Sequence, residues 1–170
     1  MIFSIHIKLF VILLISLRLA GQTTYSCNAS AACGCSANSV TLSRIVGGET
    51  ASSNTWGWAV FLLINGSFQC GGSILSSTWI LTAAHCIPSG TTSVTVYAGS
   101  IYRFSGNRIV SASTVYIHPG YNESGFIHDI ALLKLGTPLN LTIAGLDSVC
   151  LPFVSAATLA AEDWPSPNTT

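Results

Sequence analysis

Two residues of this sequence have the types that catalysis on an acyl group requires. His85 lies in residues 81–86, Leu-Thr-Ala-Ala-His-Cys, and Asp129 begins residues 129–135, Asp-Ile-Ala-Leu-Leu-Lys-Leu. A histidine acts as a general base when a carboxylate holds it in one tautomer and supports its protonated form. Such a pair can activate a hydroxyl or thiol nucleophile. The residue types therefore predict nucleophilic catalysis, provided that the fold brings the two side chains together.

Each residue also has an ordinary structural interpretation. A histidine in an apolar segment is more often a hydrogen-bonded core residue than a catalyst, and an aspartate at a strand end often faces water. An unpaired charge on Asp129 would be costly to bury beside the apolar residues 130–133, so a buried Asp129 needs hydrogen bonds or a cationic partner. From the residues alone, both interpretations stay open for His85 and for Asp129.

Short apolar and β-branched segments, separated by turns, are the elements that would position these side chains. They cover residues 58–64, 68–75, 79–86, 94–99, 108–118 and 129–135. The dipeptide Asn65-Gly66 is a strong hairpin signal, and Gly71 and Gly72 inside a strand indicate either a close backbone approach or a barrel corner. Residues 156–161 could form a helical turn that is too short to carry a domain. The pattern predicts an all-β fold, either a closed antiparallel barrel or a sandwich.

The amino terminus and the composition predict an exported chain. An apolar run at residues 9–15 follows Lys8 and precedes small residues, so residues 1–21 are predicted to be a signal peptide and not a membrane anchor. The chain has no net charge, only 7% charged residues and no basic stripe, which argues against a nucleic-acid partner. Asn-x-Ser/Thr sites make five residues candidates for N-glycosylation: Asn28, Asn65, Asn122, Asn140 and Asn168.

An even number of cysteines in an exported chain predicts disulfides. The six are Cys27, Cys33, Cys35, Cys70, Cys86 and Cys150. The closely spaced residues 33–35 have no nearby histidine that would complete a tetrahedral metal set, so we predict neither a metal nor a cofactor. Residues 22–43 have no period of 2 or 3.6 and are predicted to be an exposed, flexible leader held by disulfides.

Residues 44–48, Arg-Ile-Val-Gly-Gly, follow this leader and have two interpretations. An exposed Arg44 before a β-branched pair is a good proteolytic site in a mobile segment. The same residues could equally begin an ordinary strand that is followed by a turn. The local sequence does not choose between the two.

The chain resembles trypsin-like serine proteases of the chymotrypsin family from about Arg44 to Pro152. Five motifs occur in the family's order: residues 44–48 (RIVGG), 70–73 (CGGS), 81–86 (LTAAHC), 118–121 (HPGY) and 129–133 (DIALL). The resemblance implies that His85 is the general base and that Asp129 is the carboxylate that orients it. It also implies the family's fold of two six-stranded antiparallel barrels, of which this chain resembles the first.

The resemblance has further implications for disulfides and processing. It implies a Cys70–Cys86 disulfide and a link from Cys150 to one of the three cysteines before residue 36, with the other two pairing locally. The Arg44–Ile45 bond is similar to the family's zymogen cleavage site, which a trypsin-like activating protease would cut. The domains implied are a signal peptide at 1–21, a propeptide at 22–44 and a truncated peptidase domain at 45–170. Residue 128 is His where the family usually has Asn, a departure expected to matter little.

The family's nucleophile motif, Gly-Asp-Ser-Gly-Gly-Pro, does not occur in these 170 residues, and neither do its oxyanion donors and specificity pocket. We therefore expect a fragment of a secreted serine endopeptidase zymogen, whose substrates are proteins or peptides and which protein inhibitors could bind. The chain alone is expected to be inactive. The alternatives are a secreted non-catalytic homologue that acts as a binding or decoy protein, and a disulfide-stapled β module unrelated to proteolysis.

Overall fold

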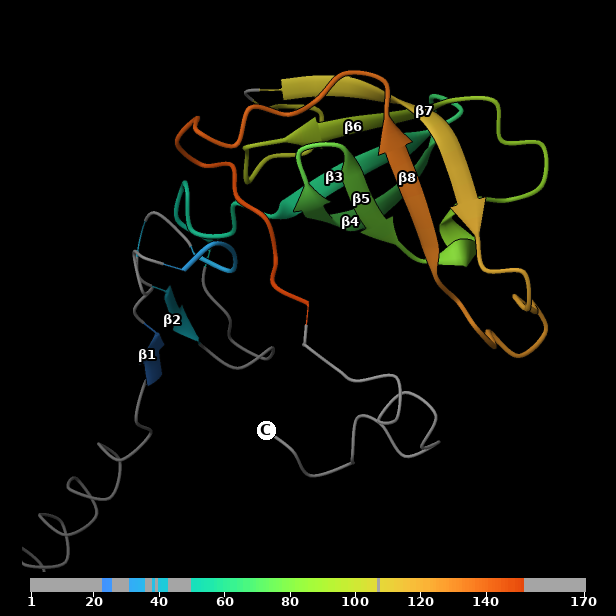
Figure 1. Ribbon diagram of the computed structural model, residues 1–170, viewed down its shortest axis with the longest axis horizontal. Coiled ribbons are helices and arrows are strands. Elements are labelled where there is room, and N and C mark those ends of the chain that lie inside the picture. The colour runs from blue at the N-terminus through green and yellow to red at the C-terminus, as the bar shows by residue number, and fades with distance from the viewer. Residues whose placement is uncertain are drawn as a thin grey trace, which may run out of the picture.

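A closed six-stranded antiparallel barrel forms the main body of the protein (Figure 1). The computed structural model describes residues 23–25, 31–35, 38, 40–42, 50–106 and 108–151. Around the barrel the strand order is β3-β4-β5-β8-β7-β6. The strands are β3 (Ala59–Ile64), β4 (Phe68–Ser76), β5 (Trp79–Thr82), β6 (Val94–Ala98), β7 (Arg108–Ile117) and β8 (Ala131–Leu135). The predicted all-β fold with a six-stranded antiparallel barrel is confirmed.

Alternation of side chains along the strands fills the inside of the barrel. On β3, Val60, Leu62 and Ile64 are buried, whereas the residues between them lie partly exposed on the outer face. The same period of two places Val94, Val96 and Ala98 of β6 in the core. The largest fully buried side chains are Leu62, Ile64, Ile74, Ile80, Val96 and Leu133. Because all six strands contribute to one core or close the ring around it, each strand supports the position of the others.

The Asn65-Gly66 turn joins β3 to β4, as the sequence predicted. Both residues have positive φ angles, 50° and 71°, and the loop that they form with Ser67 places Ile64 opposite Phe68. The side-chain Oδ1 of Asn65 accepts hydrogen bonds from the backbone N–H groups of Thr92 (2.9 Å) and Ser93 (3.1 Å). The hairpin is thereby attached to the loop that leads into β6.

Of the two adjacent glycines in β4, only Gly72 lies close to the backbone of the neighbouring strand. A Cβ atom at Gly72 would lie 2.8 Å from the carbonyl oxygen of Leu81 and 3.0 Å from Cγ2 of Ile80. At Gly71 the nearest atom would be 3.9 Å away, which is an ordinary contact. The predicted close approach of the backbone is therefore right for Gly72 and wrong for Gly71.

Two predicted strands have different ends in the structure. Strand β5 stops at Thr82, and the 3₁₀ helix η1 (Ala84–Cys86) follows it where the sequence predicted a continuing strand. Similarly, Asp129 precedes β8 and lies in a turn in which His128 has a φ of 52°. A continuous apolar run gives no sign of where a strand begins or ends, and here the chain leaves the sheet at both places.

The leader was predicted to be exposed, flexible and held by disulfides, and parts of it also form two short strands that the sequence did not indicate. Strands β1 (Thr23–Tyr25) and β2 (Val40–Leu42) pair in an antiparallel sheet. Strands of three residues are too short to show a period of two, so the pattern could not reveal them. The predicted signal peptide and the helical turn at 156–161 lie outside the described residues. Within the described ranges, no helix has the length and apolar character that crossing a membrane requires.

Candidate active site

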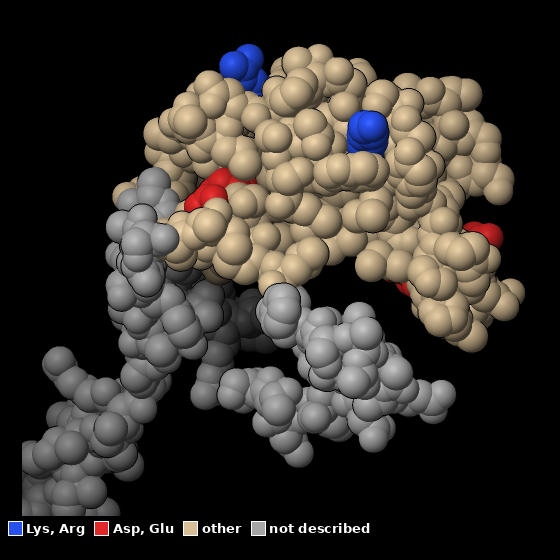
Figure 2. All heavy atoms as spheres, viewed as in Figure 1, with Lys and Arg blue, Asp and Glu red and all other residues tan. Residues whose placement is uncertain are grey.

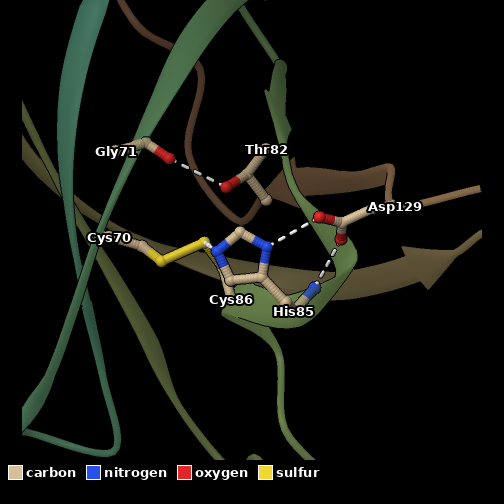
Figure 3. The surroundings of a disulfide bond; sticks show 6 residues. All are labelled: Cys70, Gly71, Thr82, His85, Cys86 and Asp129. Carbon is tan, nitrogen blue, oxygen red and sulfur yellow. Dashed lines mark hydrogen bonds and ion pairs between the residues drawn. A yellow bond between two sulfur atoms is a disulfide. The ribbon is translucent and has the colours of Figure 1, made fainter. Parts of the chain in front are cut away.

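His85 and Asp129 are in direct contact, although 44 residues separate them in the sequence (Figure 3). Oδ2 of Asp129 lies 2.7 Å from Nδ1 of the His85 ring, and Oδ1 accepts a hydrogen bond of 2.8 Å from the His85 backbone N–H. An ionised carboxylate can only accept, so Nδ1 carries the proton of this bond and a neutral ring keeps its lone pair on Nε2. The contact therefore leaves Nε2 available as a proton acceptor.

Paired strands bring the two residues together. Strands β5 and β8 are antiparallel neighbours, and Thr82 at the end of β5 lies opposite Ala131 at the start of β8. His85 is the middle residue of η1, three positions after the end of β5, and Asp129 precedes β8 by two residues. Because antiparallel pairing places the end of one strand beside the start of the next, these flanking residues meet at one edge of the barrel.

The electrostatics of the pair favour a charged carboxylate. The side-chain hydrogen bond from His85 lowers the pKa of Asp129 below its ordinary value, and the bond from the His85 backbone lowers it further. The side chain of His85 is 45% exposed and that of Asp129 is 21% exposed. The carboxylate is thus shielded behind the ring, while the ring itself is open to a reacting group.

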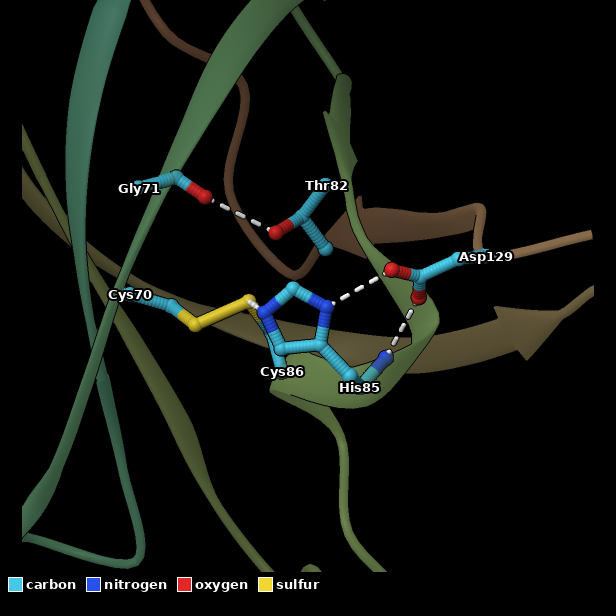
Figure 4. Close-up of polar contacts among 6 residues, drawn as sticks. All are labelled: Cys70, Gly71, Thr82, His85, Cys86 and Asp129. Carbon is cyan, nitrogen blue, oxygen red and sulfur yellow. Dashed lines mark hydrogen bonds and ion pairs between the residues drawn. A yellow bond between two sulfur atoms is a disulfide. The ribbon is translucent and has the colours of Figure 1, made fainter. Parts of the chain in front are cut away.

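A disulfide and a threonine support the histidine from the barrel side. Cys70 of β4 is bonded to Cys86 of η1, and Sγ of Cys86 lies 3.6 Å from Nε2 of His85. The hydroxyl of Thr82, which is buried, donates a hydrogen bond of 2.8 Å to the carbonyl of Gly71 (Figure 4). These two links attach the segment that carries His85 to the neighbouring strand β4.

The disulfide and the histidine form the one cluster of potential metal ligands within the described part of the chain. The ligand atoms of Cys70, His85 and Cys86 all lie within 4.8 Å of one another. Zinc binds thiolate sulfur, however, and here the two sulfur atoms are bonded to each other. In its oxidised form the cluster is therefore a disulfide beside a histidine, without thiolate ligands.

The turn before Asp129 places further ring side chains around it. The rings of His118 and His128 stack with centroids 4.5 Å apart and an angle of 25° between their planes. The positive φ of His128 is a conformation that Asn and His adopt more readily than most residues, which fits a position where the family usually has Asn. The hydroxyl of Tyr121 is buried and has no partner among the described residues. Burial, followed by the charges of Asp129 and Glu123, raises the pKa of this hydroxyl.

Phe126 is a residue of the site that the sequence did not indicate. Its ring stands edge-on to the ring of His85, with centroids 5.8 Å apart and planes at 89°, and the residue is 61% exposed. An exposed aromatic residue in a polar segment was the available signal, but no periodic pattern connects residue 126 with residue 85. Phe126 therefore lies directly against the exposed ring of His85.

Other predicted residues lie apart from this pair or outside the described chain. The structure bonds Cys150 to Cys33, one of the three alternatives that stayed open, and Cys35 is disulfide-bonded as well. The candidate glycosylation residues Asn65, Asn122 and Asn140 are exposed on turns of the barrel. Five predicted site residues lie outside the described residues: Cys27, Asn28, Arg44, Ile45 and Asn168.

Comparison with known proteins agrees with the barrel fold. The family model described as Trypsin matches residues 45–163. The chain belongs to the trypsin family. It is 36% identical over 124 residues to trypsin alpha of Drosophila melanogaster, 42% over 100 residues to trypsin delta of the same species, and 41% over 100 residues to trypsin alpha-4 of Lucilia cuprina. These alignments cover 71%, 58% and 58% of this chain.

The chain spans less than half the length of these trypsin relatives, because the alignments cover 48%, 40% and 39% of them. Among solved structures, HL collagenase is similar with a TM-score of 0.58 and 29% identity, over 68% of this chain and 50% of that one. The described barrel thus corresponds to about half of a trypsin-family protein.

Proposed function

We propose that this chain contributes the general base and its orienting carboxylate to a secreted serine endopeptidase. The two-point contact between Asp129 and His85 is the observation that carries this proposal. It holds the ring by Nδ1, keeps the charge of the carboxylate and leaves Nε2 free to accept a proton. Membership of the trypsin family makes hydrolysis of peptide bonds the reaction that this geometry fits best.

In the proposed reaction, Nε2 of His85 takes the proton of a serine hydroxyl as its oxygen attacks the substrate carbonyl. Asp129 stabilises the imidazolium that forms and keeps the ring in its orientation. The proton then passes from Nε2 to the leaving amine. The serine, the oxyanion donors and the specificity pocket would be supplied from outside these 170 residues, so the chain alone is proposed to be inactive.

The proposal extends to export and activation. Residues 1–21 would be a signal peptide, and residues 22–44 a propeptide that a trypsin-like protease separates at the Arg44–Ile45 bond. The Cys33–Cys150 disulfide supports this division, because it would keep the leader covalently attached to the barrel after that cut. Substrates would be extracellular proteins or peptides, protein inhibitors would compete with them, and exposed sequons would carry glycans.

The first test is the transcript sequence beyond the codon for Thr170. A reading frame that continues to Gly-Asp-Ser-Gly-Gly is expected and would supply the missing nucleophile. A stop codon directly after Thr170 would contradict a triad protease, and a non-catalytic binding or decoy protein would then take its place.

The second test is enzymatic and uses the activated protease that contains this chain. His85→Ala is expected to lower kcat/KM by about 10²–10⁴-fold, because it removes the general base. Asp147→Asn is the matched control, since Asp147 bonds the backbone of Ser148 and is expected to leave kcat/KM unchanged. In contrast, hydrolysis by the 170-residue chain alone that disappears in His85→Ala would show that a nucleophile is present in it.

A further inference from the structure

The three described sequons differ in what their asparagine side chains do. In Asn65, Oδ1 accepts from the backbone of Thr92 and Ser93, and Nδ2 donates to the carbonyl of Gly90 at 3.5 Å. In Asn122 and Asn140, Nδ2 has no partner among the described residues. An oligosaccharide is attached to this nitrogen, so the free amides are suited to modification and the Asn65 amide is part of the fold.

The turn in which Asn122 lies leaves its side chain accessible for attachment of a glycan. Its Oδ1 accepts a hydrogen bond of 2.9 Å from the backbone N–H of Ser124, which is also the hydroxyl residue of the sequon. The residue is exposed, and so are the four that follow it. The amide oxygen is therefore held by the turn, and Nδ2 is left to solvent.

The same turn connects Asn122 to the histidine site. Asn122 and Ile127 exchange two backbone hydrogen bonds, of 3.0 and 3.2 Å, and so face each other across a short hairpin. The neighbour of Ile127 in this hairpin is Phe126, whose ring contacts the ring of His85. A group attached to Asn122 would thus lie on the same hairpin as Phe126, the residue whose ring contacts His85.

We propose that Asn122 carries an N-linked glycan at the rim of the His85–Asp129 site, and that this glycan limits the approach of protein-sized molecules. The inference rests on the proposed export of the chain. The anomeric carbon of a lipid-linked oligosaccharide diphosphate forms a bond to Nδ2, its bond to the diphosphate oxygen breaks, and Nδ2 loses one proton. A bulky, hydrated glycan would leave small peptides free to enter and would obstruct large proteins.

The presence of a glycan on Asn122 is tested by expressing the 170-residue chain in secretory cells. Glycopeptides from the medium and from the lysate are mapped together. We expect glycan on Asn122 in the wild type and its loss in Ser124→Ala. This variant removes the sequon while it keeps Asn122 and the bond from the residue-124 backbone. Ser124→Thr keeps the sequon and should keep the glycan. An unmodified Asn122 in wild-type chains that carry glycan on Asn140 would overturn the proposal.

The steric effect is tested on the monomeric fraction of each protein, isolated by size exclusion, with chymotrypsin as a protein-sized probe of the exposed Phe126. Cleavage after Phe126 should be several-fold faster in Ser124→Ala than in the wild type. Cleavage after Tyr102, which is 69% exposed in another loop, serves as the internal reference and should not change. Equal rates after Phe126 in both proteins would show that a glycan at Asn122 does not cover the rim.

The experiment separates failure of this inference from failure of export. If the chain is not exported, residues 1–21 stay attached and no sequon is modified, Asn140 included. That result would overturn both the export proposal and the glycan. If the signal peptide is removed and Asn140 is modified without Asn122, only the inference about Asn122 is wrong.

Discussion

At the scale of residues, the site depends on how Asp129 uses both of its carboxylate oxygens. One oxygen binds the His85 ring and the other binds the His85 backbone, so the ring cannot turn without losing a charge-assisted bond. The carboxylate is partly shielded, and its charge contributes to the raised pKa of the Tyr121 hydroxyl. This arrangement sets the tautomer of His85 through ordinary hydrogen bonding.

The pKa of Asp129 should reveal this contact directly. In the wild type the pKa of Asp129 should lie below the ordinary value of 3.8, and in His85→Ala it should rise part of the way back, because only the backbone bonds from residues 84 and 85 remain. Since the folded-state pKa is the lower one, the contact stabilises the fold above pH 3.8 and this stabilisation is lost as the pH falls through the folded-state pKa. Carboxyl ¹³C shifts followed by NMR against pH measure both values. An Asp129 pKa that His85→Ala leaves unchanged would contradict the assigned cause.

At the scale of elements, pairing of β4, β5 and β8 places the catalytic candidates. Strand β4 carries Cys70, β5 leads to His85, and β8 follows Asp129, so the site stands at the edge of three consecutive strands of the barrel. The disulfide and the Thr82–Gly71 hydrogen bond attach β4 to the segment after β5. The position of the histidine therefore depends on how closely β4 and β5 pack.

Gly72→Ala tests this packing against Gly71→Ala, a control one residue away on the same strand. The new methyl group at residue 72 would meet the Leu81 carbonyl at 2.8 Å and should destabilise the fold by about 1–3 kcal/mol. The methyl group at residue 71 has no atom nearer than 3.9 Å and should cost clearly less. Urea unfolding followed by tryptophan fluorescence at low protein concentration measures both. Equal losses would mean that the β4–β5 approach is not what requires glycine.

At the scale of the whole molecule, the described barrel exposes many apolar side chains and few charges. Figure 2 shows a face on which Lys, Arg, Asp and Glu are isolated spots in a neutral surface. Next to His85, the segment 117–130 alone exposes Ile117, Phe126, Ile127 and Ile130 by 41–61%. Neighbouring apolar side chains on a soluble domain indicate a surface that another protein unit covers.

The 170-residue chain by itself should therefore self-associate or be secreted poorly. In light scattering coupled to size-exclusion chromatography, we expect species larger than the monomer, and the double substitution Phe126→Ser with Ile130→Ser should reduce them. Tyr102→Ser, which removes an exposed aromatic residue from a different loop, is the control and should have a smaller effect. Monomeric wild-type chain in good yield with a cooperative thermal transition would contradict this expectation.

The sequence by itself determined the local features that have a short-range physical cause. A period of two and β-branched residues indicated the six barrel strands, and Asn65-Gly66 indicated a hairpin because few other dipeptides accept two positive φ angles. The motifs around His85 and Asp129 indicated which side chains belong together. In each case neighbours in the chain carry the information.

The tertiary structure decided everything that depends on distance across the barrel. It joined His85 to Asp129 by two bonds, required glycine at residue 72 and not at residue 71, and selected Cys33 among three candidates for Cys150. It also placed Phe126 in front of the histidine. Sequence spacing cannot give these results, because each depends on which strands become neighbours when the sheet closes and on how closely their backbones approach.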